Sequence, residues 1–162
     1  MKRLWAPWRM AYIAGEDKAS RKGCIFCDKP RQRRDAANHI LHRGESVFAM
    51  MNLFPYNNGH LMIAPYRHIG DFAKLGRAEL LEMMELAQSC QRAITAEMRP
   101  DGFNIGFNLG RTAGAGIAGH IHLHLVPRWN GDTNFMPVLG GVKVISEALD
   151  ATYRKIKSRL AP

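Results

Sequence analysis

The segment GHIHLHLVPRW, residues 119–129, places a histidine at every second position and fills the positions between them with apolar residues. Because side chains alternate between the two faces of a β-strand, a strand here puts His120, His122 and His124 on one face and leaves the apolar face to pack on a core. Lys, Thr or Glu would solvate an exposed face equally well. Imidazole can act as nucleophile, acid, base or metal ligand near neutral pH, so the pattern favours a functional site.

The spacing of these histidines argues against one metal ion bound by all three. Same-face neighbours lie about 6.5–7 Å apart along a strand, so the outer two lie about 13 Å apart. Zinc–nitrogen bonds are only about 2.0–2.1 Å long. Neighbouring histidines could share a metal only with ligands from elsewhere in the chain. The three histidines are therefore expected to have different roles.

The sequence around this strand predicts an α+β fold, a single domain with an antiparallel sheet and two main helices. Apolar runs at 46–54 and 60–65 flank the turn sequence PYNNG and predict a hairpin-like pair of strands. A glycine-containing run at 102–110 is expected to form another strand of the sheet.

Two stretches, 76–98 and 142–160, have the apolar spacing of amphipathic helices. The first ends before Pro100, which cannot continue a helix. Its apolar face is expected to consist of Leu80, Met84, Ala87, Ile94 and Met98. Within the single domain we expect an irregular N-terminal segment (1–35), a catalytic core (36–137) and a C-terminal helical part (138–162).

The composition points to a soluble protein with anionic partners. The 162 residues are 46% hydrophobic and carry a formal net charge of +9, which favours nucleic acid or phosphorylated small molecules as partners. Apolar runs stay well short of the roughly 20 residues that span a bilayer. The start, MKRLWAPWRMAYIAG, lacks the apolar centre of a signal peptide. A cytoplasmic location is expected.

The three cysteines argue against a disulfide framework, since no secretion signal accompanies them. Cys24 and Cys27 have the spacing of a zinc knuckle, although the same motif occurs in redox pairs and in pairs of buried small residues. The flanking sequence lacks a thioredoxin-like strand–helix pattern, which weakens the redox alternative. Cys90 lies in a predicted helix and is expected in the core. His39 and His42 match no motif and are expected at the surface.

The segment HIHLHLV resembles the signature of the histidine triad (HIT) superfamily, in which apolar residues alternate with three histidines. MNLFPYNNGHLMIAPYRHIGDF (51–72) and FNLGRTAGAGIAGH (107–120) resemble the family sequence that precedes the triad. RLWAPWRMAYI (3–13) and PRWNGDTNFMP (127–137) are similar to the bacterial branch related to diadenosine tetraphosphate phosphorylases and hydrolases. The resemblance extends over nearly the whole chain.

The resemblance implies an enzyme that cleaves or transfers nucleotides at an α-phosphate, with His122 as a covalent nucleophile. A neutral imidazole can attack phosphorus, and its adduct stays reactive enough for water, phosphate or another acceptor to remove it. In the family, a backbone carbonyl near the first triad histidine fixes the tautomer of this ring. By motif position, His124 and His60 would contact phosphate, Asn52 would bind ribose and Asn108 would contact phosphate.

One position departs from the family pattern. Many relatives carry Gln, Ser or Thr a few residues before the triad, where this chain has Ala115 and Gly116. Backbone N–H groups of the glycine-rich loop, near Gly116, are expected to replace the missing side-chain donor in binding substrate. The departure bears on which acceptor and which substrate are preferred.

The resemblance also implies structural zinc. Several bacterial relatives bind it through two cysteines, a histidine after the second strand and the first triad histidine. The matching residues here are Cys24, Cys27, His68 and His120. Four protein ligands close a tetrahedral site and leave no open position for catalysis, so the ion would attach the N-terminal segment to the sheet.

Two functions stay open on this evidence. One is a nucleotidyl hydrolase or transferase acting on dinucleoside polyphosphates or nucleotide conjugates. The other is a nucleotide- or nucleic-acid-binding module with weak or no catalysis, which the basic charge and the missing donor keep open. The intact His60, His122 and His124 favour the enzyme over a nucleic-acid partner. By analogy with the family we also expect a two-fold homodimer through 76–98 and 102–110, and no membrane association.

Overall fold

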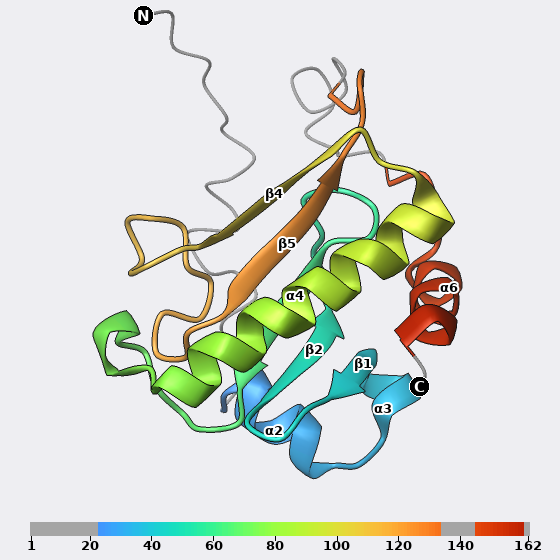
Figure 1. Cartoon of the computed structure of the whole chain (residues 1–162). Coiled ribbons are helices and arrows are strands. Elements are labelled where there is room, and N and C mark those ends of the chain that lie inside the picture. Colours follow the sequence, from blue (N-terminus) through green and yellow to red (C-terminus); the bar gives the residue numbers. More distant parts are fainter. Residues whose placement is uncertain (1–22, 134–144, 161–162) are drawn as a thin grey trace, which may run out of the picture.

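Five strands form one antiparallel sheet in the computed structural model, which describes residues 23–133 and 145–160 (Figure 1). The strands lie side by side in the order β1, β2, β3, β5, β4, and every neighbouring pair is antiparallel. Their bounds are β1 Ile40–Arg43, β2 Val47–Met51, β3 Leu61–Pro65, β4 Gly102–Phe107 and β5 Leu123–Arg128. The predicted α+β fold with an antiparallel sheet is confirmed.

The strands differ from the predicted ones in two places. The sequence does not predict β1, because its four residues, ILHR, are too short for a periodic signal. The histidine strand begins later than predicted, at Leu123, so His120 and His122 lie in the segment that leads into β5. This segment runs beside the chain that follows β3, where the N–H of Ile121 donates to the carbonyl of Ile69 (2.6 Å).

The two main helices are α4, Arg77–Met98, and α6, Leu149–Leu160. At the start of α4, Glu79 accepts a hydrogen bond from the N–H of Gly76 (2.8 Å), and the helix ends at Arg99 in the left-handed conformation. α6 is shorter than predicted, since residues 145–148 are not helical and 142–144 lie outside the described residues. None of the helices in the described part of the chain is long and apolar enough to cross a membrane.

The larger hydrophobic core lies between one face of the sheet and the helices α4 and α6. The buried residues of α4 are Met83, Leu86, Ala87, Cys90, Ala93 and Ile94. The predicted apolar face was therefore partly wrong, because Met84 is 48% exposed. Apolar residues occupy neighbouring rows of this helix, and periodicity alone does not decide which row the sheet covers. Cys90 is buried as predicted, and burial raises the pKa of its thiol to about 12.

A second, smaller core lies on the opposite face of the sheet. It consists of Phe26 and the sheet residues Ile40, Phe48, Met50, Met62 and Ala64. Met62 pairs directly with His124 in the sheet, so this face also carries the histidines. Phe26 belongs to helix α2, Ile25–Arg31, which is followed by α3, Asp35–Asn38. The N-terminal segment is thus more regular than predicted where it is described, and it packs on the histidine face.

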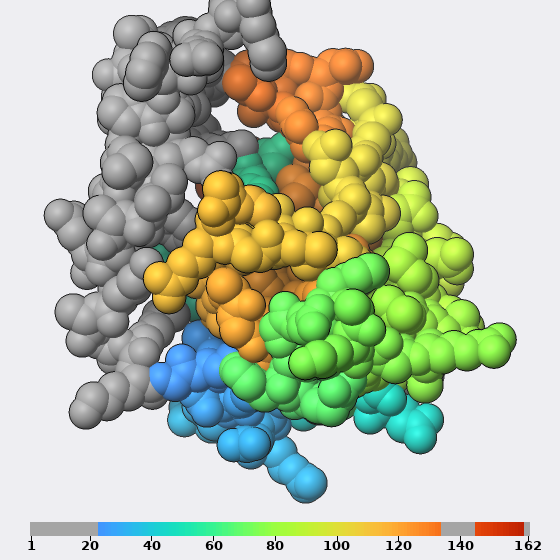
Figure 2. All heavy atoms as spheres, turned by 90° about the vertical axis from the view of Figure 1, so that its left-hand side faces the viewer, coloured from blue at the N-terminus to red at the C-terminus, as the bar shows by residue number. Residues whose placement is uncertain are grey.

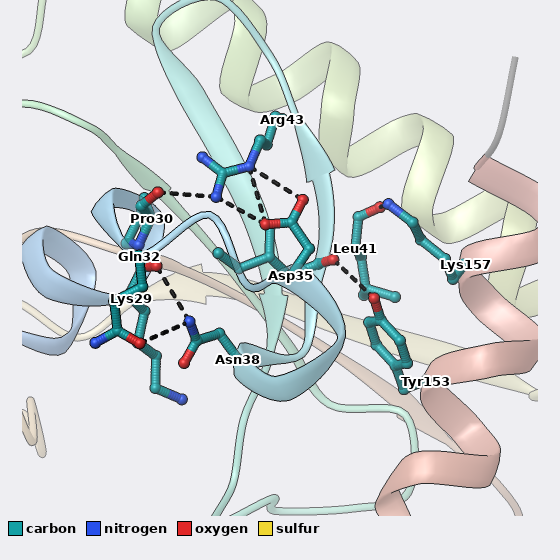
Figure 3. A network of polar contacts seen from close by, with 10 residues as sticks. Lys29, Pro30, Gln32, Asp35, Asn38, Leu41, Arg43, Tyr153 and Lys157 are labelled. Carbon is teal, nitrogen blue, oxygen red and sulfur yellow. Dashed lines mark hydrogen bonds and ion pairs between the residues drawn. The ribbon is translucent and has the colours of Figure 1, made fainter.

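A polar network fastens the C-terminal end of α2 to the sheet (Figure 3). The Arg43 guanidinium on β1 donates to both carboxylate oxygens of Asp35 and to the carbonyl of Pro30 (2.8 Å). The Asn38 amide donates to the carbonyl of Lys29 (3.2 Å). Hydrogen bonding to Arg43 lowers the pKa of the Asp35 carboxyl, so the ion pair is maintained at neutral pH.

His39 is not the surface histidine that the sequence predicts. Its side chain is only 15% exposed, and its Nε2 lies 2.7 Å from the carboxylate of Asp150 on α6. Its ring also meets the ring of Tyr153 edge-on, with centroids 5.5 Å apart. His39 and Asp150 lie far apart in the sequence, which is why no local pattern indicates their contact.

Candidate active site and metal site

Three histidines lie together where β3 and β5 begin. His60 is fully buried, and His122 and His124 are 6% and 8% exposed. The ring centroids of His122 and His124 are 4.7 Å apart, and those of His60 and His124 are 5.1 Å apart. Met62 of β3 pairs directly with His124 of β5, so His60, two residues before Met62, lies diagonally across from His124.

His122 is held at one ring nitrogen and open at the other. Its Nδ1 lies 2.8 Å from the carbonyl oxygen of His120. Since a carbonyl only accepts, Nδ1 carries the proton and Nε2 keeps the lone pair. Within the described part of the chain, Nε2 of His122 has no hydrogen-bond partner. It is not one of the fully buried polar atoms that lack a partner, since among the described residues only Nδ1 of His39 is such an atom. Nε2 of His122 therefore reaches solvent. Burial lowers the pKa of His122, which keeps the ring neutral at pH 7.

A backbone N–H sets the tautomers of His60 and His124. The N–H of Tyr56 donates to Nδ1 of His60 (3.0 Å), so the proton of a neutral His60 sits on Nε2, which lies 2.9 Å from Nδ1 of His124. His124 accepts at Nδ1 and carries its own proton on Nε2. Burial, followed by the nearby His122, lowers the pKa of His124 to about 4. His124 therefore stays neutral and keeps an N–H donor at Nε2.

Asn52 and Asn108 border this pair. The side-chain oxygen of Asn52 accepts from the N–H of Phe54 (3.0 Å), and its amide nitrogen lies 3.3 Å from Nδ1 of His60. The amide nitrogen of Asn108, just after β4, lies 3.5 Å from Nε2 of His124. The structure thus brings both predicted ligand residues next to the histidines.

The loop between β4 and β5 offers backbone groups at the position where the sequence departs from the family pattern. Ala115 is buried, and its N–H donates to the carbonyl of Gly110 (3.2 Å). Gly110 and Gly114 have φ angles of +81° and +92°, which favour glycine. Gly116 is exposed. No hydrogen bond within the described part of the chain links Gly116 to the histidines, so its role in binding substrate stays a prediction.

Two aromatic side chains that no sequence motif indicates, Tyr56 and Phe26, border the histidines. The ring of Tyr56 lies against His60 and His124, with centroid distances of 4.6 and 5.7 Å. The ring of Phe26 lies against His122 at 4.7 Å. The available signals were weak: Phe26 occupies a variable position of the CxxC motif, and Tyr56 lies in a sequence whose composition indicates only a turn.

The four residues predicted as metal ligands converge on one point. Their ligand atoms all lie within 4.8 Å of one another. Nδ1 of His120 is 3.2 Å from Sγ of Cys24 and 3.5 Å from Sγ of Cys27, and Nδ1 of His68 is 3.3 Å from Sγ of Cys27. A tetrahedral ion with zinc-like bond lengths separates such sulfur and nitrogen atoms by about 3.5 Å. The distances fit, and this group could hold a metal ion.

The ring of His120 is oriented for this role. Its Nε2 lies 2.9 Å from the carbonyl oxygen of Pro65, so Nε2 carries the proton and the Nδ1 lone pair faces the sulfurs. A backbone carbonyl of this kind commonly fixes the tautomer of a metal-bound histidine. Burial lowers the pKa of His120 and so favours the neutral form that binds metals. Both Cys24 and Cys27 are free of disulfides.

The ligands come from three segments that are distant in sequence: the start of α2, the chain after β3 and the chain before β5. Gly70 permits their close approach, because a Cβ at this position would lie 2.9 Å from the carbonyl oxygen of Ala118 and 3.1 Å from Gly119. Figure 2 shows the blue start of the described chain, the green segment after β3 and the amber loop before β5 side by side on one face. Sequence spacing alone does not indicate this meeting point.

Both the sequence and the fold are similar to proteins of one family. The HIT domain model matches residues 33–131. The AP-4-A phosphorylase of Mycobacterium tuberculosis is 40% identical over 167 aligned residues, which cover 99% of this chain and 85% of that protein. An uncharacterised HIT-like protein of Methanocaldococcus jannaschii is 30% identical over an alignment that covers 83% of this chain and 98% of that protein. A Zn-bound histidine triad family protein from Mycobacterium smegmatis has a crystal structure that matches with a TM-score of 0.68 at 25% identity, over 85% of this chain and 93% of that one.

Proposed function

This chain belongs to the HIT family, and from that premise we propose a nucleotidyl hydrolase or phosphorylase that cleaves dinucleoside polyphosphates, or nucleotide conjugates, at the α-phosphate. The observation that carries the proposal is the state of His122: a neutral ring with its proton held on Nδ1 and the lone pair of Nε2 open to solvent. The relative named AP-4-A phosphorylase supports a substrate of the diadenosine tetraphosphate type.

In the first step, Nε2 of His122 attacks the α-phosphorus, and an N–P bond forms as the bond to the leaving phosphate oxygen breaks. The remaining polyphosphate leaves as an anion, so it needs hydrogen bonds rather than a proton. The N–H of His124 supplies one of them to a phosphate oxygen. The Nδ1 proton stays on His122, shared with the carbonyl of His120. The adduct is therefore a nucleotidyl-imidazolium, which keeps a good leaving group for the next step.

In the second step an acceptor attacks the same phosphorus, and His122 leaves as neutral imidazole. Inorganic phosphate as acceptor gives a nucleoside diphosphate, whereas water gives a nucleoside monophosphate and releases a proton. We assign Asn108 to the phosphate and Asn52 to the ribose. A backbone N–H near Gly116 would stand in for the side-chain donor found in many relatives.

His60 acts through His124 in this proposal. Motif position predicts that His60 contacts the phosphate, but both of its ring nitrogens have partners within the protein. We therefore assign it a positioning role: its Nε2–H occupies Nδ1 of His124 and thereby keeps the His124 proton on the nitrogen that faces the phosphate.

We propose that the metal bound by the Cys₂His₂ group is zinc, and that its role is structural. The donor set and distances support zinc, as does the Zn-bound relative. When bound, the ion would tie α2 to the segments beside β3 and β5. Cysteines that are free of disulfides are typical of a reducing compartment, and we place the protein in the cytoplasm.

We also propose a two-fold homodimer formed through α4 and the edge strand β4. Both elements expose apolar side chains: Leu81 and Met84 of α4 are 58% and 48% exposed, and Ile105 of β4 is 47% exposed. A two-fold axis would bury the same patch on both subunits. Light scattering coupled to gel filtration should give twice the monomer mass, and a monomer at micromolar concentration would contradict the proposal.

The alternative is a nucleotide- or nucleic-acid-binding module with weak or no catalysis. The net charge of +9 and the absence of a side-chain donor at Ala115 and Gly116 favour it. Binding to nucleic acid would weaken steeply with added salt. A binding module has no need for a neutral His122 ring with a free Nε2 lone pair, and for this reason we favour the enzyme.

One incubation separates these possibilities. The protein is mixed with diadenosine tetraphosphate, with and without inorganic phosphate, and the products are separated. ADP and ATP that form only with phosphate identify a phosphorylase, and AMP and ATP without phosphate identify a hydrolase. If neither pair forms and an AMP amidate is not turned over, the enzyme proposal fails and salt-dependent binding of RNA or DNA becomes the next measurement.

A further inference from the structure

Phe26 lies between the candidate metal site and the proposed active site, and no step of the proposed reaction uses it. It lies between Cys24 and Cys27 in the CxxC motif and is only 1% exposed. Its ring centroid is 4.7 Å from that of His122, at an interplanar angle of 33°, and 5.2 Å from that of His120. One side chain of α2 therefore touches both a residue of the metal site and the ring whose Nε2 is open to solvent.

We propose that Phe26 is a positioning residue for His122: α2, held at the metal site, keeps the phenyl ring against the imidazole and so fixes the direction of the Nε2 lone pair. The inference rests on the proposed function, in which Nε2 attacks phosphorus.

A single hydrogen bond does not fix an imidazole ring. The bond from Nδ1 of His122 to the carbonyl of His120 restrains one edge, and the ring can still tilt about it. Packing removes this freedom, because Phe26 lies against the ring on one side and the ring of His124 meets it at 67°. A reacting group needs to be held within about 10–20° of its productive direction. The contact with Phe26 supplies that restraint.

Phe26 is suited to this role because its helix is fastened at both ends. At the start of α2, the N–H of Cys27 donates to the carbonyl of Cys24 (2.9 Å), and both thiols belong to the metal site. At the other end, Arg43 holds the carbonyl of Pro30 (Figure 3).

Phe26→Leu and Phe48→Leu are matched variants for testing this role. Both remove an aromatic ring from the same buried cluster. Among the ring contacts of the described residues, Phe48 meets Phe26 and Tyr66 but no histidine. Zinc content, kcat and KM for diadenosine tetraphosphate with phosphate, and the NMR signals of the His122 ring are measured for each variant and for the wild type. Phe26→Met, whose flexible side chain fills gaps, replaces Phe26→Leu if that variant does not fold.

The expected result is specific to Phe26. Phe26→Leu lowers kcat about tenfold, which corresponds to about 1.4 kcal/mol, and leaves KM and zinc content nearly unchanged. Its His122 ring nitrogens change from a single Nδ1–H tautomer to a mixture, which the nitrogen chemical shifts report. Phe48→Leu keeps the wild-type kcat and the single tautomer, because the contact with His122 is intact.

Equal losses of kcat in both variants, or loss of zinc from Phe26→Leu, would assign the effect to general packing or to the metal site and overturn the proposal. The NMR signals separate this proposal from the proposed function. A wild-type protein without turnover whose His122 tautomer changes only in Phe26→Leu contradicts the function and supports the positioning role. An active protein in which Phe26→Leu keeps both kcat and tautomer contradicts the positioning role alone.

Discussion

The candidate metal site and the proposed active site contain histidines two residues apart, and they differ in which ring nitrogen the backbone occupies. His120 donates from Nε2 to the carbonyl of Pro65 and turns Nδ1 toward the cysteine sulfurs. His122 donates from Nδ1 to the carbonyl of His120 and turns Nε2 toward solvent. The backbone carbonyl that accepts from each ring therefore decides which nitrogen is free: Nδ1 of His120 for a metal ion and Nε2 of His122 for a substrate.

The two sites also differ in how they are closed. Four side chains from three segments form the candidate metal site, and an ion with these four ligands would have no open position for a substrate. The proposed active site keeps one nitrogen of His122 open, next to the ring of the neutral His124, whose centroid lies 4.7 Å away. If this division is correct, variants should damage one site and spare the other, and only α2 should connect the two.

The largest expected effect is that of His122→Ala, which removes the proposed nucleophile. Turnover of diadenosine tetraphosphate should fall by at least about 10³-fold, since the variant lacks the nitrogen that would form the covalent intermediate. Nucleotide binding, measured by calorimetry, should persist, and zinc content should stay at one per chain because the four ligands are untouched. Near-normal turnover in this variant would exclude the covalent route.

Next in size is the loss of the metal site by Cys27→Ser. The purified wild type should contain about one zinc per chain, and the variant much less. The midpoint of thermal unfolding should fall by more than about 5 °C, because α2 loses its attachment to the sheet. Cys90→Ala is the matched control, since it removes a buried thiol outside the site and should leave zinc content unchanged. Zinc-free protein with wild-type stability would contradict a structural metal.

A smaller effect is expected from His60, which touches the reaction only through His124. His60→Ala should lower kcat by about 10²-fold, as expected when one fixed donor in the active site is lost. His60→Gln should retain more activity, because its amide can accept from the N–H of Tyr56 and donate to Nδ1 of His124. KM should change less than kcat in both variants. Equal activity of the alanine and glutamine variants would contradict the proposal that His60 fixes the tautomer of His124.

The smallest effect concerns stability against pH. The pKa of His124 is about 4 in the folded protein and about 6.5 in an unfolded chain, so between these values the unfolded state binds more protons. The contribution of His124 to the free energy of unfolding is therefore complete above about pH 6.5 and is lost as the pH falls toward 4. In urea titrations His124→Gln should show a flatter pH dependence than the wild type. An unchanged slope would mean that this ring is not kept neutral by burial.

The residue types of both sites could be predicted from the sequence, but the ring nitrogen that each histidine leaves free could not. Residue types could be predicted, because thiolates, imidazoles and their spacing are what metal binding and phosphorus chemistry require, and Cys24, Cys27, His68 and His120 do meet. The free nitrogen of each ring could not be predicted. It depends on the carbonyl of Pro65 and the N–H of Tyr56, whose positions the fold decides.

The sequence also does not predict which row of α4 is buried or where Phe26 lies, because packing against other segments decides both. Met83 and Met84 are equally apolar, and only packing against the sheet selects Met83 for burial. Phe26 is adjacent to the metal ligands in sequence, yet its contact with His122 arises only because α2 lies across the histidine face. The burial of Met83 and the contact of Phe26 both depend on packing between segments that are distant in the sequence, and a local sequence pattern does not encode such packing.

The most direct test of a covalent nucleotide on His122 is intact-protein mass spectrometry. The protein is mixed with diadenosine tetraphosphate without phosphate, and the reaction is quenched rapidly without acid before the measurement. The account predicts one added adenylyl group per chain, assigned by fragmentation to His122 and removed when phosphate is supplied. A protein that turns over the substrate without this adduct, or that carries it on another residue, would contradict the account.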